Sequence, residues 1–187
     1  MVEKAPFGLV SVKKEVYIKI ARDVMKFADP SEPFGNWREV YGVLGGRIHI
    51  GTCYITDCKT MNIGTQTDVG FTTQNYIDAA LFEEELRKKD ERQHLVGWFH
   101  SHFIGLEYSG VDIMNHLGWQ NDNNPFAIGL VFDPQHLSKE NPGFAILKLK
   151  DYNLGDISPV ESVDFVITIP KDERDDYLAY LKKNLSF

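Results

Sequence analysis

Segments of strand character and segments of helical character alternate along this chain of 187 residues. The strand-like segments are short and apolar, whereas the helical ones repeat apolar residues every three or four positions. Because the alternation is uneven, it predicts a mixed α/β or α+β sandwich and not a regular parallel sheet. The expected strands are 39–46, 47–56, 94–100, 126–134, 144–150 and 163–170, and the expected helices are 11–28, 72–90, 109–120 and 172–185.

Local signals define where some of these elements begin and turn. The first helix is expected to start behind Ser11. Strands 39–46 and 47–56 are expected to form a hairpin that turns at Gly45–Gly46, because glycine pairs favour tight turns. Ser109 is the expected N-cap of the third helix, since a serine oxygen can accept from the free N–H groups of a first helical turn.

The bulk composition excludes several functions. With 43% hydrophobic residues and no linker or repeat, residues 1–187 are expected to form a single domain. No apolar run approaches the roughly 18 residues of a membrane span, and charged residues stand where a signal peptide would be apolar. A net charge of -7, without a basic cluster longer than Arg87–Lys89, argues against nucleic acid as a partner. We therefore expect a cytoplasmic protein.

The stretch VGWFHSHFIGLEYSGVD, residues 96–112, concentrates the side chains with chemical potential. His100 and His102 end a strand and project to one face, because strand side chains repeat every second residue. Asp112 lies in the first turn of the next helix, whose N-terminus can bring the carboxylate to both imidazoles. Two nitrogens and one oxygen leave the fourth position of a zinc ion open, and water bound there has a pKa of about 7. The spacing predicts a catalytic metal site.

Each of these residues also has an ordinary structural interpretation. A His-x-His pair alone is a weak motif, and a serine before a helix is most often only a cap. Glu39 taken alone would be a solvated carboxylate at a strand edge. His116 lies one turn after Asp112 on the same helix face and could compete as a ligand, but ranks below it. The ordered combination of strand, His-x-His, loop, Ser-x-x-Asp and helix is what favours an active site.

The segments GWFHSH and SGVD, with EVYGVLGG upstream, resemble the JAMM (MPN-plus) family of zinc metalloproteases, most of all its proteasome-lid deubiquitinase and the archaeal homologues. The resemblance implies an MPN-type fold, in which helices flank a central mixed β-sheet in a cytidine-deaminase-like layout. It implies Zn²⁺ as the cofactor, with His100, His102 and Asp112 as ligands. It also implies Glu39 as the general base and Ser109 as the residue that stabilises the oxyanion.

Two departures from the family pattern fall in the loop before the third helix. Phe103 stands where the family usually has proline, and the segment from His102 to Ser109 is one residue shorter. Because the spacing from Ser109 to Asp112 is kept, the site is expected to survive. The altered loop is expected to change specificity or to hold Glu107 near the substrate groove.

The resemblance implies a zinc-dependent isopeptidase that removes ubiquitin or a ubiquitin-like modifier from lysine side chains. Its partners would be such conjugates, and a proteasome or another MPN-domain protein. A catalytically silent MPN scaffold is one alternative, disfavoured because all five site positions are filled. A JAMM peptidase acting on carrier-protein tails or small substrates is another. Zinc content separates enzyme from scaffold, and cleavage of a conjugate compared with a free peptide separates the two enzymes.

Overall fold

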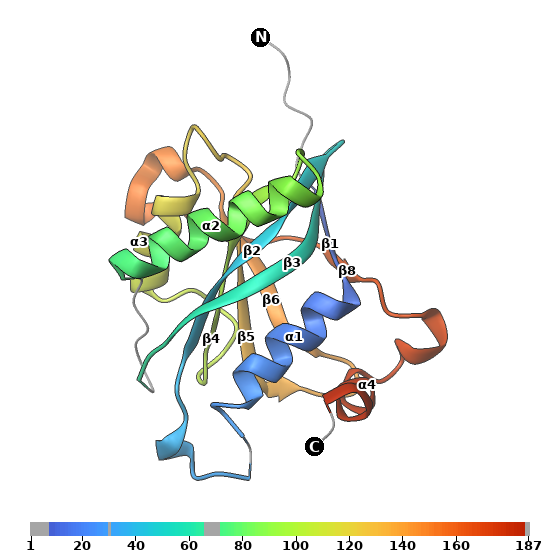
Figure 1. Ribbon diagram of the computed structural model, residues 1–187. Coiled ribbons are helices and arrows are strands. Elements are labelled where there is room, and N and C mark those ends of the chain that lie inside the picture. The colour runs from blue at the N-terminus through green and yellow to red at the C-terminus, as the bar shows by residue number, and fades with distance from the viewer. Residues whose placement is uncertain (1–7, 30, 66–71, 186–187) are drawn as a thin grey trace.

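The computed structural model describes residues 8–29, 31–65 and 72–185, which form an eight-stranded sheet with helices on both faces (Figure 1). The strand order is β7-β6-β5-β4-β2-β3-β1-β8. Strand β4 pairs in parallel with β5, and β1 with β3 and β8, whereas the other neighbours are antiparallel, so the predicted mixed sheet is confirmed. The strands are β1 (Leu9–Val12), β2 (Val40–His49), β3 (Thr52–Ile63), β4 (His94–Ser101), β5 (Ile128–Leu137), β6 (Pro142–Leu149), β7 (Val160–Ser162) and β8 (Phe165–Ile167), and the α-helices are α1 (Lys14–Met25), α2 (Thr73–Lys89), α3 (Gly110–Trp119) and α4 (Tyr177–Leu185).

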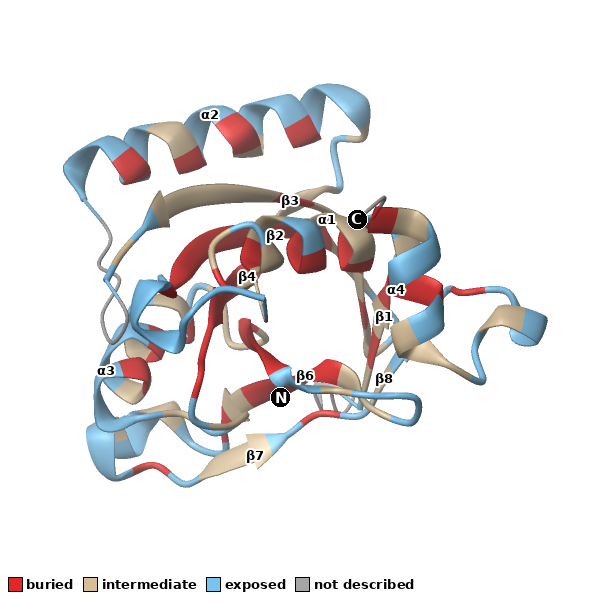
Figure 2. Cartoon of the chain, turned by 90° about the horizontal axis from the view of Figure 1, so that it is seen from below, coloured by how far each residue is buried: buried red, intermediate tan, exposed pale blue. Residues whose placement is uncertain are grey.

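The two faces of the sheet carry different helices. Figure 2 shows the sheet curving around α1, with α2 on the outer face. Val16, Ile20 and Val24 of α1 are buried at helical spacing in the main hydrophobic core. On the outer face, Leu86 of α2 packs with Val43 of β2 in a second cluster. Among the described residues, no helix has both the length and the apolar character needed to cross a membrane.

The hairpin of β2 and β3 is present, but the predicted position of its turn is wrong. The turn is formed by Ile50–Gly51, both with positive φ, as a type I′ hairpin turn requires. Gly45 and Gly46 lie inside β2 instead, at a β-bulge. A Cβ atom at Gly45 would overlap the side chain of Leu86, and one at Gly46 would overlap the carbonyl oxygen of Tyr54. The glycine pair therefore permits close packing on β2.

The first helix begins later than predicted, because Ser11 belongs to a strand and does not cap the helix. Strand β1 directs Val10 and Val12 into the core and pairs with β3 and β8. The helix itself starts at Lys14. Four strand residues directly before a helix offer too few alternating positions for the pattern to reveal a separate element.

The edges of the sheet also differ from the prediction. The strand expected over 163–170 is the three-residue β8, and the equally short β7 was not predicted. The helix expected from Asp172 begins at Tyr177. Both short strands lie at the edges of the sheet, where a strand has a neighbour on one side only. Three residues are also too few for an alternating apolar pattern to be recognised in the sequence.

Strand β4 occupies the centre of the sheet, between β2 and β5, and is buried from Val96 to its end. Gly97 lies where β4 closely approaches β5, because a Cβ atom there would overlap the carbonyl oxygen of Ile128. With a neighbour on each side, the end of β4 is a rigid support for the side chains that it carries.

We expect Gly97→Ala to destabilise the protein by roughly 1–3 kcal/mol, because the backbone of β5 must move to admit the methyl group. Gly118→Ala is the matched control, since nothing lies within contact distance of that position on α3. Alanine there should be neutral or stabilising by up to about 1 kcal/mol. Urea unfolding measures both variants. A Gly97→Ala protein as stable as the control would contradict the close approach of the two strands.

Candidate metal centre

Three buried side chains converge at the end of β4. The Nε2 atoms of His100 and His102 lie 2.8 Å apart. Asp112 Oδ1 is 3.1 Å from Nε2 of His100, and its Oδ2 is 3.2 Å from Nε2 of His102. All three residues are buried. Within residues 8–29, 31–65 and 72–185, no other three histidine, cysteine or acidic side chains come together in a geometry suited to a metal ion.

Strand alternation and a helix start bring these side chains together. His100 belongs to β4, and His102 follows it by two residues. The N–H of His102 donates to the carbonyl oxygen of Phe132 at 2.9 Å, so the chain keeps its pairing with β5 and both imidazoles stay on one face. Asp112 lies in the first turn of α3 and reaches the imidazoles from the other side of the loop.

Ser109 is the N-cap of α3, as predicted. Its Oγ accepts from the N–H of Asp112 at 3.2 Å and donates to Oδ2 of the same residue at 2.6 Å. The N–H of Ser109 donates to this oxygen as well, at 2.8 Å. This reciprocal capping box orients the carboxylate, and the helix dipole favours its negative charge. The hydroxyl proton of Ser109 is thus directed at Asp112.

The protonation of the cluster fits a divalent cation. Burial raises the pKa of Asp112, but hydrogen bonds from both histidines outweigh burial and hold this pKa well below its usual range. Burial lowers the pKa of His100. Burial also lowers the pKa of His102, but the hydrogen bond to Asp112 and the charges of Asp112 and Glu39 together raise this pKa overall. One ionised carboxylate and two imidazoles form a donor set that suits a catalytic zinc ion with one open position.

Glu39 lies beside His102, directly before β2. The antiparallel register pairs Tyr41 with His100, and its continuation by two residues places Glu39 opposite His102 on the same face. The negative charge of Glu39 raises the pKa of His102, although burial and the contacts with Asp112 have larger effects on this pKa. Only 8% of Glu39 is exposed, so its interpretation as a solvated strand-edge carboxylate is wrong.

An aromatic stack packs against His100. The Trp98 ring is nearly parallel to the His100 imidazole, with centroids 4.7 Å apart, and to the ring of Tyr41, at 5.2 Å. Phe99, the next residue of β4, lies in the main core on the opposite face. Strand alternation thus directs Trp98 to the same side of the sheet as His100.

Both ring nitrogens of His116 are engaged away from the three-residue cluster. Its Nδ1 accepts from Trp98 Nε1 at 2.9 Å, and its Nε2 lies 2.9 Å from Oε1 of Gln120. Burial lowers the pKa of His116 to about 4, so the ring is neutral at pH 7. Sequence reasoning placed His116 on the face of Asp112 but missed its partners. The four-residue spacing of Asp112, His116 and Gln120 is the signal that could have found Gln120.

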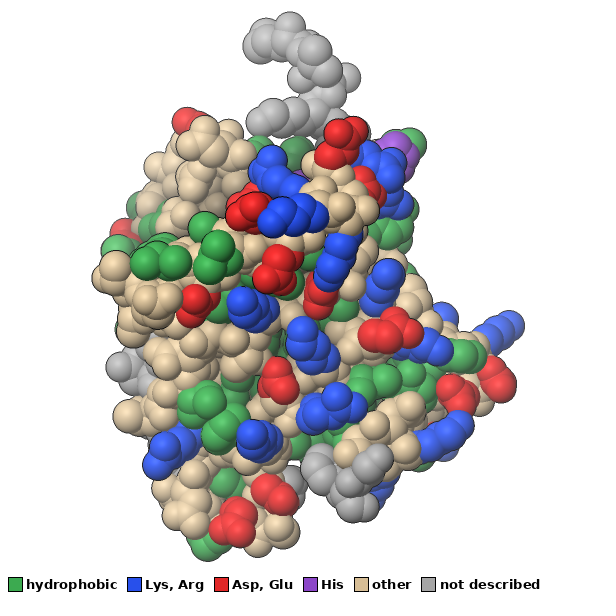
Figure 3. All heavy atoms as spheres, viewed as in Figure 1, with side chains coloured by type: hydrophobic (Ala, Val, Ile, Leu, Met, Phe, Trp, Pro, Cys, Tyr) green, Lys and Arg blue, Asp and Glu red, His purple; other side chains and the backbone are tan. Residues whose placement is uncertain are grey.

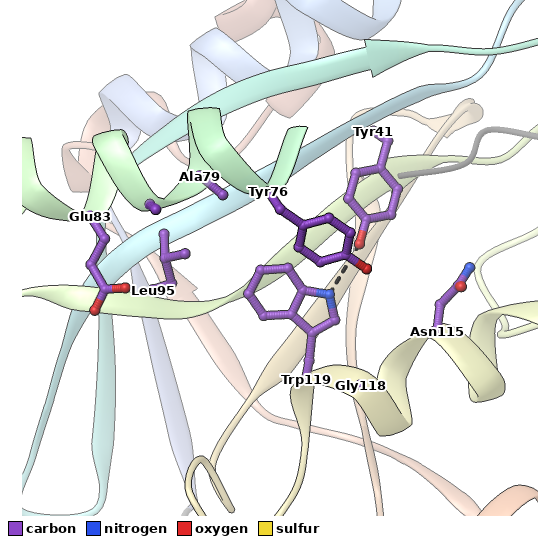
Figure 4. Close-up of a pocket in the computed structure, with 9 residues that line it drawn as sticks. Tyr41, Tyr76, Ala79, Glu83, Leu95, Asn115, Gly118 and Trp119 are labelled. Atoms are coloured by element: carbon purple, nitrogen blue, oxygen red, sulfur yellow. Dashed lines mark hydrogen bonds between the residues drawn. The ribbon is translucent and has the colours of Figure 1, made fainter. Parts of the chain in front are cut away.

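A pocket of about 320 Å³ lies between α2 and α3, next to this stack (Figure 4). Figure 4 shows the rings of Tyr41, Tyr76 and Trp119 clustered at one side, where Trp119 Nε1 donates to the Tyr41 hydroxyl at 3.1 Å. Tyr41 also stacks on Trp98, so it links the pocket to the candidate metal centre. The lining residues are Tyr41, Tyr76, Ala79, Ala80, Glu83, Leu95, Asn115, Gly118 and Trp119.

The loop that departs from the family pattern is anchored to the core. Phe103 is buried, with its ring edge-on to Trp37 at a centroid distance of 5.2 Å. The N–H of Gly105 donates to the buried Asp133 carboxylate at 2.9 Å. Glu107 is exposed. Phenylalanine in place of proline therefore contributes packing to the loop, and the capping box that follows is intact.

This fold and cluster define the class of protein. Residues 7–125 match the JAB1/Mov34/MPN/PAD-1 ubiquitin protease family, and the chain belongs to that family. It is similar to COP9 signalosome complex subunit 5 of Yarrowia lipolytica (strain CLIB 122 / E 150), with 31% identity over 98 residues. That alignment covers 51% of this chain but 27% of the relative, so the chain spans little more than a quarter of the length of this curated relative.

The neutral state of His116 makes stability depend on pH. Its folded pKa of about 4 lies below the ordinary 6.5, so the unfolded chain takes up a proton first as the pH falls. The stabilising contribution is complete above about pH 6.5 and is lost as the pH falls toward 4. Between about pH 7 and 4.5, the unfolding free energy of the metal-free protein should fall by roughly 2–3 kcal/mol more than that of His116→Gln.

Glutamine is the matched variant because its amide can accept from Trp98 and donate to Gln120 without titrating. Urea unfolding at a series of pH values measures the difference. Parallel pH profiles for the two proteins would show that His116 is not held neutral in the fold.

Proposed function

We propose that this protein is a zinc-dependent isopeptidase that removes ubiquitin or a ubiquitin-like modifier from lysine side chains. The observation that carries the proposal is the buried convergence of His100, His102 and Asp112 in a chain of the ubiquitin protease family. A zinc ion held by these residues supplies a Lewis acid that makes water nucleophilic near neutral pH. The reaction is hydrolysis of the isopeptide bond.

Glu39 is the proton shuttle in this proposal. Hydrolysis requires a proton to leave the attacking water and a proton to reach the departing lysine amine. The largely buried carboxylate of Glu39 lies next to His102, where it can serve both transfers. The hydrogen bond of 2.9 Å from the Val40 N–H to Ser101 Oγ ties the start of β2 to the end of β4 and keeps Glu39 in place.

Ser109 has two roles that the proposal keeps apart. Its hydroxyl orients the Asp112 carboxylate, and it is also exposed at the start of α3, beside the reacting centre. A substrate carbonyl oxygen that gains negative charge can compete with Asp112 for the same proton. Ser109 is therefore proposed as the donor to that oxygen.

The pocket between α2 and α3 is proposed to receive an apolar side chain of the substrate. The first half of α2 extends this surface, with apolar side chains over that half and charged ones over the second half (Figure 3). Tyr76, Ile77 and Leu81 are each at least half exposed there. A folded modifier offers area for such a contact, whereas a small substrate fills only the pocket.

The protein is proposed to act in an assembly with another MPN-domain protein or a proteasome. Its relative from Yarrowia lipolytica is by name a subunit of a complex, and the sequence motifs resemble the proteasome-lid enzyme. Free, buried Cys53 and Cys58 suit a reducing compartment such as the cytoplasm. Residues 1–187 are proposed to form one domain, since strands before and after residue 125 share a sheet.

Two alternatives predict other properties. A catalytically silent scaffold has no need of a buried carboxylate and two buried imidazoles, which cost desolvation free energy. The cluster therefore favours an enzyme. A JAMM peptidase for carrier-protein tails or small substrates needs the cluster but not a surface for a folded modifier, and it would cleave a free peptide as readily as a lysine-linked conjugate.

Metal content and turnover together test the proposal. The wild type should hold about one zinc per chain and cleave lysine-linked conjugates within a panel of ubiquitin and ubiquitin-like modifiers. His102→Ala should lose both zinc and turnover. Glu39→Gln should keep zinc but lose most turnover, because an amide cannot carry the proton. Full zinc occupancy in His102→Ala would refute the metal site. Wild-type turnover in Glu39→Gln would exclude Glu39 as the proton shuttle.

The two roles of Ser109 separate in Ser109→Ala. Loss of an N-cap costs typically ~1 kcal/mol of stability and leaves chemistry unchanged. Loss of an oxyanion donor lowers turnover by roughly a hundredfold or more. We expect the second effect, measured as kcat beside the thermal midpoint and the zinc content. A lowered midpoint with unchanged kcat would leave Ser109 as a cap alone, with the metal site intact.

A further inference from the structure

Helix α3 presents a polar buried face. Its buried residues are Asp112 and His116, and the buried Gln120 follows as the C-cap. These three residues are four positions apart, so they form one row along the helix. Val111 and Met114 are exposed instead. The rotation of α3 therefore depends on the hydrogen bonds of this row as well as on the apolar packing of Trp119.

A continuous set of hydrogen bonds runs from β4 through α3 to β6. The indole Nε1 of Trp98 can only donate, so Nδ1 of His116 accepts and Nε2 carries the ring proton. That proton is donated to Oε1 of Gln120. Gln120 in turn accepts from the N–H of Leu149 at 2.8 Å and donates from Nε2 to its carbonyl oxygen at 3.0 Å. The set fixes both the tautomer of His116 and the end of α3.

The set reaches two of the proposed metal ligands, Asp112 through the helix row and His100 through Trp98. Asp112 lies one helical turn before His116, so the rotation that places His116 also places the carboxylate. Trp98 stacks on His100 with 17° between the ring planes, so the hydrogen bond that orients the indole also limits the tilt of the imidazole. Trp98 and His116 are both fully buried, which leaves neither ring an alternative partner in solvent.

The packing around the stack supports the same view. Gly129 pairs with Trp98 across β4 and β5. A Cβ atom at Gly129 would overlap the hydroxyl of Tyr108 and come within 3.2 Å of Trp98 Nε1. The Tyr108 hydroxyl lies 3.2 Å from Nδ1 of His116. The absence of a side chain at Gly129 therefore leaves room for both donors that face His116.

We infer that His116 and Gln120 are positioning residues of the metal centre. They do not bind the ion. They hold α3 and the Trp98 ring in the orientation in which the Asp112 carboxylate and the His100 imidazole face one point. This inference rests on the proposed function in one respect, namely that the ion is the zinc proposed in that section. Outer partners of this kind typically change metal affinity or activity by 10- to 100-fold when they are removed.

The test measures zinc affinity by titration against a competing chelator. His116→Leu removes the hydrogen bonds of both ring nitrogens, and we expect it to bind zinc roughly 10- to 100-fold more weakly than the wild type. His116→Gln can make both bonds and should stay near the wild-type affinity. Gln120→Met, a volume-matched second variant, should weaken binding in the same direction. The loss of zinc-binding free energy in the double variant should be smaller than the sum of the losses in the two single variants, because both residues act through the same set of hydrogen bonds.

Two controls separate positioning from loss of stability. Val24→Ala, on the buried face of α1 and away from α3, lowers stability and should leave zinc affinity unchanged. The second control uses the metal-free, ¹⁵N-labelled protein. The indole N–H signal of Trp98, assigned by its absence in Trp98→Phe, should move in His116→Leu and return toward its wild-type position in His116→Gln.

Wild-type zinc affinity in folded His116→Leu and Gln120→Met would overturn the inference while leaving the metal site standing. An equal loss of affinity in Val24→Ala, or no rescue by glutamine at residue 116, would overturn it as well. A wild-type protein that binds no zinc at all would instead refute the proposed function, and the inference with it.

Discussion

The structure of the site depends on one buried contact, in which an ionised carboxylate meets two imidazoles within hydrogen-bonding distance. A charge removed from water is costly unless it is paired and hydrogen bonded. Asp112 meets this requirement through the two histidines, through Ser109 and through the N-terminus of α3. Each partner restricts the geometry further. Strand β4 must deliver the imidazoles to one face, and α3 must begin where its first turn can reach them.

The sheet supplies the rigidity that this contact requires. Strand β4 has a neighbour on each side, and hydrogen bonds continue past its end through Ser101 toward β2 and through His102 toward β5. Glu39 comes to the centre by the same register, because it continues the pairing that places Tyr41 opposite His100. Four candidate site residues, Glu39 and the three between residues 100 and 112, thus derive their placement from strand pairing and one helix start.

Local rules explain which parts of this arrangement could be predicted. The period of two in β4 and the capping box of α3 are properties of short segments, so His100, His102 and Asp112 were found from spacing. Glu39 was not, because its place depends on the pairing of β2 with β4, and only the family resemblance pointed to it. The turn was misplaced for a related reason. The pair Gly45–Gly46 allows close packing with α2 and β3, and this long-range requirement produces the same glycine pair in the sequence as a tight turn does.

The polar face of α3 connects folding to function. The helix that supplies Asp112 is held on the sheet by the hydrogen bonds of His116 and Gln120 together with the packing of Trp119, so part of its docking depends on directional polar contacts. A cation that binds the carboxylate together with two strand-borne imidazoles adds a link between the same two elements. Thermodynamic linkage then acts in both directions, because any contact that fixes α3 on β4 raises the affinity for the ion, and the ion in turn stabilises the docked helix. A helix with an apolar buried face would dock without the ion and gain little from it, so the polar row couples occupancy of the site to the order of the helix that completes it.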